Sequence, residues 1–279
     1  MTDIAPASSS TVAVIGGGVM GGAIAAAVRA GGWPADAVTV ADKNTETLAD
    51  LAAAHGLVTT TDLAEAARGA DVIVFAVKPQ DATEVLAEFS EHVKQGATLL
   101  TVAAGLPTSY YEARLPHGTA VVRAMPNTPA LVGFGATAIS AGASATDAHL
   151  AVASRVLAGT GLVVTVDESQ ISAVGAVSGS GPAYFYAFVE ALIESGITLG
   201  LDRDVATALA NQTLIGAGRL LESSGASAGE LRARVSSKGG TTLAALGAMS
   251  DAGLQTVVAV GLSAADRRTR ELAAELAGE

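Results

Sequence analysis

A glycine-rich turn near the amino end most constrains the fold of this chain. A short β-branched run, residues 12–15, leads directly into Gly16, Gly18 and Gly21 in the pattern G-x-G-x-x-G, and an alanine-rich stretch follows. In a strand–turn–helix unit, the first glycine permits a tight turn, the second admits a pyrophosphate and the third lets the helix pack closely. The helix N–H groups then face the anion. The pattern predicts dinucleotide binding, with an ordinary glycine turn as the alternative among 32 glycines.

The two halves of the chain differ in their hydrophobic pattern. Short apolar runs alternate with amphipathic stretches up to about residue 168, and only helical periodicity follows. Alternation of strands and helices predicts a mainly parallel sheet with helices on both faces. The expected fold class is α/β, a Rossmann-type doubly wound sheet followed by an all-α domain. The predicted divisions are a disordered leader over residues 1–10, a dinucleotide-binding Rossmann domain over residues 11–168 and a helical domain over residues 169–279.

The expected elements follow from the same pattern. The strands are residues 12–15, 38–40, 72–77, 98–102, 120–123 and 162–166. The helices of the first half are residues 20–29, 45–55, 62–68 and 82–93, and those of the second half are 183–200, 202–223, 228–235, 241–249 and 254–277.

Composition excludes several classes of function. The chain has no cysteine, which removes disulfides, thiolate metal sites and cysteine nucleophiles, and we expect no metal. Its 27 acids outnumber its 16 bases, and no cluster of Lys and Arg forms a basic face, so nucleic acid is not an expected partner. The amino end lacks the features of a signal peptide, and no stretch holds ~18 consecutive apolar residues. We therefore expect a cytoplasmic protein without a membrane partner.

The nucleotide preference is left open by the residues that follow the second expected strand. Asp42 lies 21 residues after Gly21, where an acid normally bonds the adenine ribose and favours NADH. Lys43 and Asn44 come next and could instead serve the 2′-phosphate of NADPH. A third reading is that Asp42 only caps the next helix.

Few residues in the chain are suited to proton transfer. The four histidines, at 55, 92, 117 and 149, each stand beside charged or loop-like sequence, and no lysine occurs between Lys94 and Lys238. A substrate that already carries its proton, such as a cyclic iminium ion, needs no dedicated acid. Residues 177–184 and 235–242 each place serines and glycines before a helix, which suits the binding of a small carboxylate. Flexible hinges or crowded helix contacts would produce the same sequence pattern.

Eight segments together resemble one family. They are Ile15–Met20, Ala76–Gln80, Ala103–Gly105, Arg123–Pro129, Gly133–Thr137, Ser178–Tyr184, Val235–Thr242 and Arg268–Leu272. In these segments, and in their order from residue 12 to about residue 272, the chain resembles the pyrroline-5-carboxylate reductases. The resemblance implies NAD(P)H-dependent reduction of 1-pyrroline-5-carboxylate to L-proline, the last step of proline biosynthesis. It also implies that residues 169–279 form a dimerisation and substrate domain, in homodimers that often assemble into larger rings.

Residue roles come from the resemblance by matched position. It implies that Ile15, Gly16, Gly17, Gly18, Val19 and Met20 hold the pyrophosphate, that Ala76, Val77, Lys78 and Pro79 line the dinucleotide, and that Ala103, Ala104 and Gly105 lie near the nicotinamide. It implies that Ser237, Gly240, Thr241 and Thr242 bind the substrate, with the catalytic Thr242 hydroxyl meeting the ring nitrogen. The chain departs from many members at Asp42, so a preference for NADPH is not carried over.

Three other functions compete with this one. A β-hydroxyacid dehydrogenase would need a catalytic lysine shortly after the glycine-rich motif, and this chain has Phe185 there. A non-catalytic nucleotide-binding protein is the second alternative, because fold alone does not set function. Such a protein would have no need to keep the segment 236–242, which this chain has intact. Reduction of a related cyclic imine stays open, since one methylene is worth only ~1–3 kcal/mol in a pocket.

Overall fold

The computed structural model describes residues 10–277, with side chains placed up to residue 275. All of the expected leader except Ser10 lies outside the described residues. The described chain forms two compact units: one runs to Ser180 and takes up the chain again from Ala265, and the other is Gly181–Ala264. The division expected after residue 168 stays a prediction.

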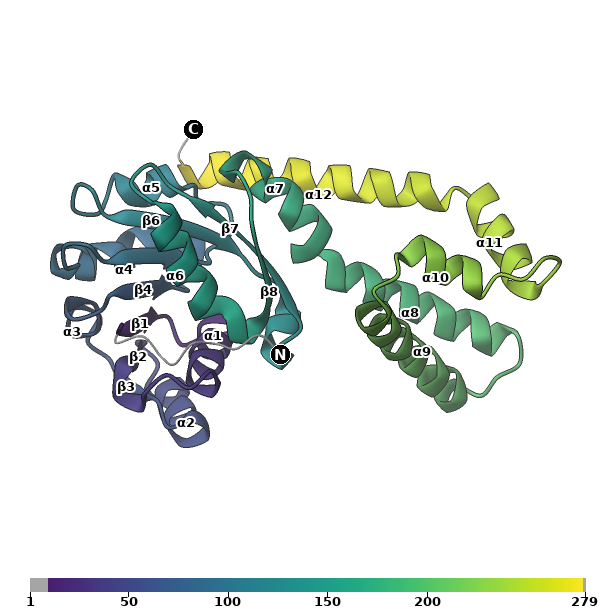
Figure 1. The fold of residues 1–279 in the computed structure, drawn as a ribbon, viewed down its shortest axis with the longest axis horizontal. Helices are drawn as coiled ribbons and strands as arrows, with labels where there is room; N and C mark the ends of the chain where they lie inside the picture. Colours follow the sequence, from purple (N-terminus) through teal and green to yellow (C-terminus); the bar gives the residue numbers. More distant parts are fainter. Residues whose placement is uncertain (1–9, 278–279) are drawn as a thin grey trace. The chain divides into compact units, whose positions relative to one another are not determined.

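The first unit is built on one eight-stranded sheet with the order β3-β2-β1-β4-β5-β6-β7-β8 (Figure 1). Every neighbouring pair is parallel except β6 and β7. The chain order reverses between β1 and β4, and ligands of open α/β sheets bind at such a point. The strands are β1 (Val12–Ile15), β2 (Val38–Ala41), β3 (Val58–Thr60), β4 (Val72–Phe75), β5 (Thr98–Thr101), β6 (Ala120–Met125), β7 (Gly135–Ala141) and β8 (Gly161–Thr165).

Helices cover both faces of the sheet and bury two separate cores. Alternate residues of the strands point to opposite faces, so Val12 and Val14 enter one core while Ala13 and Ile15 enter the other. The first core includes residues of α1 (Val19–Ala30), α2 (Thr45–His55) and α6 (Asp147–Leu157), and the second those of α3 (Leu63–Arg68), α4 (Ala82–Phe89) and α5 (Thr108–Glu112). This arrangement confirms the expected doubly wound α/β fold.

The sequence pattern missed two strands. β3 has only three residues, Val-Thr-Thr, which is shorter than the runs of about four to eight residues by which a strand is recognised in a sequence. β7 consists largely of small residues, Gly, Ala and Ser, whose intrinsic preference for strands is low. Both pair along their length, β3 with β2 and β7 with β6 and β8. Pairing with neighbours therefore decides their conformation where local preference does not.

The second half of the chain is helical, as expected. A short stretch, α7 (Ile171–Val174), continues into a π-helix over Gly175–Gly179. The remaining helices are α8 (Gly181–Thr198), α9 (Arg203–Ser224), α10 (Ala228–Arg234), α11 (Thr241–Asp251) and α12 (Leu254–Ala277). The α10 N-terminus has a capping box, in which Ser227 and Glu230 bond each other's backbone N–H groups, and the α9 C-terminus ends at the left-handed Gly225.

A buried tyrosine ties α5 to the sheet. Tyr111 is fully buried, and its hydroxyl is hydrogen-bonded to the Thr101 hydroxyl at 2.8 Å. The ring packs edge-on against Phe75 at 5.6 Å between centroids. Burial raises the pKa of Tyr111 from 10.0 to about 12. The folded state therefore retains this proton at a pH where the unfolded chain releases it.

Replacement of Tyr111 by Phe tests this coupling. Stability from the raised pKa is fully present below pH 10 and is lost as the pH rises towards 12, because only the unfolded chain ionises in that window. At about 1.36 kcal/mol per pKa unit, wild type should lose about 2–3 kcal/mol more unfolding free energy than Tyr111→Phe between pH 9 and 12. Denaturant unfolding at matched protein concentration measures the difference. Parallel declines in the two proteins would contradict the assignment.

Candidate functional site

The glycine turn after β1 brings three backbone segments into direct contact. Gly16 has φ +99°, and a Cβ there would lie 2.8 Å from the Ala76 carbonyl oxygen. A Cβ on Gly21 would overlap the Gly16 carbonyl oxygen. Gly18, the N-cap of α1, faces open space, with nothing within 4 Å of a Cβ and no side chain bonded to the cap. The turn thus fits a pyrophosphate: two glycines allow the packing, and the third leaves room above the helix N-terminus.

A cleft of about 400 Å³ opens at the carboxyl ends of β1, β2 and β4. Of the predicted nucleotide residues, Ile15, Gly16, Gly18, Asp42, Lys43, Ala76, Val77 and Lys78 line it. Leu63 of α3 and Val85 of α4 add apolar surface, and Asp81 and Glu84 add acidic surface. The cleft therefore collects side chains from positions 15–85 at the crevice where the strand order reverses.

The structure settles what Asp42 and its neighbours bond. One Asp42 carboxylate oxygen accepts the Gly17 N–H at 2.6 Å and the other accepts the Asn44 N–H at 2.8 Å. Asn44 is the N-cap of α2, where its side chain accepts the N–H groups of Glu46 and Thr47. The interpretation of Asp42 as the helix cap is therefore wrong. Its carboxylate instead fastens the glycine turn to the end of β2.

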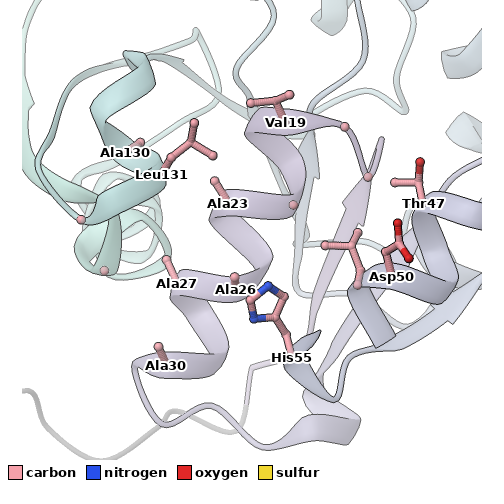
Figure 2. A pocket seen from close by; sticks show the side chains of 16 residues that line it. Val19, Ala23, Ala26, Ala27, Ala30, Thr47, Asp50, His55, Ala130 and Leu131 are labelled. Carbon is pink, nitrogen blue, oxygen red and sulfur yellow. The ribbon is translucent and has the colours of Figure 1, made fainter. Parts of the chain in front are cut away.

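A larger groove, of about 710 Å³, runs along another face of α1 (Figure 2). Figure 2 shows Ala23, Ala26 and Ala27 of α1 between Leu131 on one side and His55 at the end of α2 on the other. Of the predicted nucleotide residues, Gly17, Gly18 and Val19 line it. The groove offers few polar or charged groups to a ligand, because small apolar residues make up most of its wall.

The loop that follows β5 is fastened at both ends. The Ala103 N–H donates to the Thr101 hydroxyl at 3.3 Å at the start of the loop. At the end, the Thr108 N–H and hydroxyl both donate to the Glu168 carboxylate at 2.7 Å, and buried Arg123 donates to the same carboxylate at 3.2 Å. These bonds set the position of Ala103, Ala104 and Gly105, the segment expected near the nicotinamide.

Sequence reasoning did not find this role for Glu168. Its partners lie 60 and 45 residues away, and no local pattern links them. One signal was present: Pro107 precedes Thr108 at the start of α5, and no local side chain caps that helix. A helix start without a local cap requires a partner from elsewhere in the chain.

The serine–glycine segment before α8 packs against β6. The Asn127 side chain donates to the Ser178 carbonyl at 3.0 Å and accepts the Ala136 N–H at 2.8 Å. A Cβ on Gly179 would lie 2.8 Å from the Met125 methyl group. This segment therefore shows crowded packing, which was the alternative to carboxylate binding.

The predicted substrate residues lie together in the second unit, in the turn between α10 and α11. Gly239 has φ +75°, and the Gly240 N–H donates to the Ser237 carbonyl at 2.9 Å. The Ser237 hydroxyl lies against Gly240, 2.5 Å from where a Cβ would be. Gly240 is the N-cap of α11, and no side chain bonds its first-turn N–H groups within the described part of the chain. Thr241 and Thr242 are the first two residues of the helix, so two hydroxyl side chains belong to the turn whose N–H groups lack a side-chain cap.

The histidines take structural or surface positions. His149 caps α6 through its Nδ1 atom, and His55 ends α2. Over residues 10–277, no group of three or more His, Asp or Glu side chains is placed to hold a metal ion. Nor does a single helix there have the length and apolar character to cross a membrane. By length and composition alone, α11 together with residues 254–275 of α12 would suffice, as a pair of helices bent by 52°.

The fold and the cleft define an NAD(P)-binding oxidoreductase with a helical second unit. Residues 11–105 match the family model for NADP oxidoreductase, coenzyme F420-dependent, and residues 168–272 match the model for pyrroline-5-carboxylate reductase dimerisation. The first match covers the glycine turn and the cleft, and the second covers the turn before α11.

Full-length relatives decide the family. A pyrroline-5-carboxylate reductase of Mycobacterium tuberculosis is 39% identical over 94% of this chain and 96% of its own length. The solved structure of a pyrroline-5-carboxylate reductase from Coxiella burnetii is 34% identical, with a TM-score of 0.91 over 95% of this chain and 99% of that one. The pyrroline carboxylate reductase of Plasmodium falciparum, solved with NADP bound, is 25% identical with a TM-score of 0.80, over 95% and 98% of the two chains.

This chain belongs to the pyrroline-5-carboxylate reductase family. Its activity is the NAD(P)H-dependent reduction of 1-pyrroline-5-carboxylate to L-proline, the final step of proline biosynthesis. The expected family, activity and NAD(P)-binding domain are confirmed. The dimerisation domain indicates a homodimer.

Replacement of Gly18 by Ala separates nucleotide binding from folding. A Cβ at Gly18 meets no protein atom within 4 Å, so we expect an unchanged melting temperature. The methyl group would stand where the pyrophosphate approaches the backbone, and nucleotide affinity should fall by about tenfold or more. Nucleotide fluorescence titration measures this. Gly69→Ala, where a Cβ also meets nothing within 4 Å, is the matched control. Equal affinities of the two variants would contradict the pyrophosphate assignment.

Proposed function

We propose that the turn between α10 and α11 holds 1-pyrroline-5-carboxylate for this reaction. The supporting observation is the start of α11, where Gly240 provides no capping side chain and the first turn contains no acid. A helix N-terminus of this kind favours an anion, which suits the substrate carboxylate. Ser237, Gly240 and Thr241 bind that carboxylate, and the Thr242 hydroxyl bonds the ring nitrogen.

The nucleotide site supplies the second half of the proposal. Residues 15–20 bind the pyrophosphate, residues 76–79 line the dinucleotide, and residues 103–105 face the nicotinamide. Once bound, the reduced nicotinamide supplies the hydride for the imine. The fastened loop after β5 supports this role, because hydride transfer requires reacting atoms held within about 3–3.5 Å.

The chain itself has little proton chemistry to perform. The imine reacts as its protonated form, so the residues need only orient it and exclude competing contacts. Thr242 is half-buried in the first turn of α11, one residue after Thr241 of the proposed carboxylate site. Positioning and electrostatic stabilisation then account for most of the catalysis.

Purified protein mixed with 1-pyrroline-5-carboxylate and NADPH or NADH provides the direct test. Loss of the reduced-nicotinamide absorbance, with proline as the product, is the expected result. A folded protein that binds a nucleotide but oxidises neither NADPH nor NADH would contradict the proposal.

Replacement of Thr242 by Val tests the proposed catalytic contact. Loss of one hydrogen bond to a charged group costs about 1.5–3 kcal/mol, so turnover should fall by about ten- to a hundredfold. The nucleotide dissociation constant should not change, because residues 15–105 form that site. Thr242→Ser keeps the hydroxyl and should retain most of the activity. Full activity in the Val variant, or equal loss in both variants, would remove Thr242 from this role.

The second unit supports assembly of dimers, and we extend the proposal to a larger ring of dimers. Of its described residues, few are buried, among them Val189, Ala206 and Ala210. Large apolar side chains of α8, α9 and α12 stay exposed, among them Phe185, Tyr186, Phe188, Leu209, Ile215, Val257, Val258 and Val260. A monomer rarely leaves so much apolar surface in water. A second copy is the partner that covers it.

Replacement of Val257 by Asp tests this assembly. Val257 is 67% exposed, so the change should leave the subunit folded and place an unpaired charge in the apolar contact between copies. We expect native mass spectrometry to show dimers or multiples of dimers for wild type and a shift towards monomer for the variant. Val58→Asp, on the exposed edge strand β3, should keep the wild-type mass. A monomeric wild type would contradict the dimer, and a dimer without higher multiples would contradict the ring.

A cytoplasmic location is part of the same proposal. It is supported by the acidic composition, with a net charge of −11, and by a substrate and nucleotide that belong to biosynthetic metabolism. Fractionation of the source cells, with the activity followed in each fraction, would test it. Activity confined to a membrane or exported fraction would contradict it.

A further inference from the structure

We propose that this chain is built for NADH and discriminates against NADPH, with Asp42 as the specificity-determining residue. The inference deepens the proposed nucleotide site and rests on it. It is carried by the bonding of three neighbours at the end of β2, each of which has a different partner in the structure.

The Asp42 carboxylate is fixed in place at the edge of the cleft. Its two oxygens accept the N–H groups of Gly17 and Asn44, one from the glycine turn and one from its own loop. Each oxygen accepts one N–H group and keeps lone pairs for a ribose hydroxyl. A hydroxyl donates to such a carboxylate, whereas a 2′-phosphate dianion at the same point would be repelled.

The charged residue that could receive a 2′-phosphate, Lys43, is engaged elsewhere. Lys43 donates to Glu88 at 2.8 Å and to Glu84 at 3.1 Å, and these bonds raise the pKa of its ammonium group. The Asn44 side-chain oxygen caps α2, and its amide carries no positive charge to offset the Asp42 carboxylate. Exposed ion pairs are individually weak, so Lys43 could be drawn away. Even then, the phosphate would meet Asp42, with Glu84 on the same wall.

The remaining cation of the cleft lies on its other side. Lys78 follows β4, whereas Asp42 follows β2, and β1 lies between these strands. Strands are spaced ~4.8 Å apart, which separates the two strand ends by ~10 Å. Acids at 42, 81 and 84 outnumber the two lysines around the cleft. The local charge therefore favours the nucleotide with fewer phosphates.

Binding of each nucleotide, measured apart from turnover, tests the proposal. We expect isothermal titration to give a dissociation constant at least about tenfold lower for NADH than for NADPH, because the Asp42 carboxylate repels a 2′-phosphate placed against it. The ratio of the two kcat/KM values should have the same direction. Because binding is read without the imine, loss of reductase activity alone would overturn the proposed function and leave this inference to be judged by binding.

Two variants and a control identify the cause. Asp42→Ser should shift the preference towards NADPH by about tenfold or more, as a ratio that is insensitive to any general loss of affinity. The variant Glu88→Gln removes one of the two Lys43 ion pairs at a residue that does not line the cleft, and it should improve NADPH binding while NADH binding is kept. Asp50→Ser removes one exposed acid from α2 outside this cleft and should change neither. Tighter NADPH binding by wild type, or an unchanged ratio in Asp42→Ser, would overturn the proposal.

Discussion

The close approach of backbone at the end of β1 is the constraint on which the rest of the first unit depends. Gly21 lies against the Gly16 carbonyl, and Gly16 in turn lies against Ala76. A side chain at either glycine would push α1 from the sheet or part β1 from β4. The same contact leaves the α1 N–H groups at the crevice between the strands. Packing of the fold and binding of an anion are thus two consequences of one arrangement of glycines.

The second unit depends on a different constraint, because few of its described apolar side chains are buried within the single chain. Its helices pair, α8 with α9, but pairs of helices cannot enclose the apolar side chains that they carry. Association with a second copy then supplies burial that a single chain lacks. The stability of this unit becomes inseparable from assembly.

The sequence predicted the sheet and the glycine turn because each is encoded locally. Val12–Ile15 and Val72–Phe75 are continuous apolar runs, and the glycines stand at fixed spacing. It did not predict β7 or the Glu168 contacts. β7 is composed of small residues and is a strand only because β6 and β8 pair with it. Glu168 joins segments far apart in the chain, and a single sequence holds no pattern for such contacts.

Helix caps explain how an acidic chain would bind the two anions of the proposed function. α2, α3 and α10 begin with Asn44, Asp62 and Ser227, whose side chains bond the first N–H groups, and each has a glutamate in its first turn. α1 and α11 begin with Gly18 and Gly240 and have neither feature. Their N–H groups still require acceptors. In the proposed function the pyrophosphate and the substrate carboxylate would complete these two caps, so the attraction would be local and would not depend on the net charge.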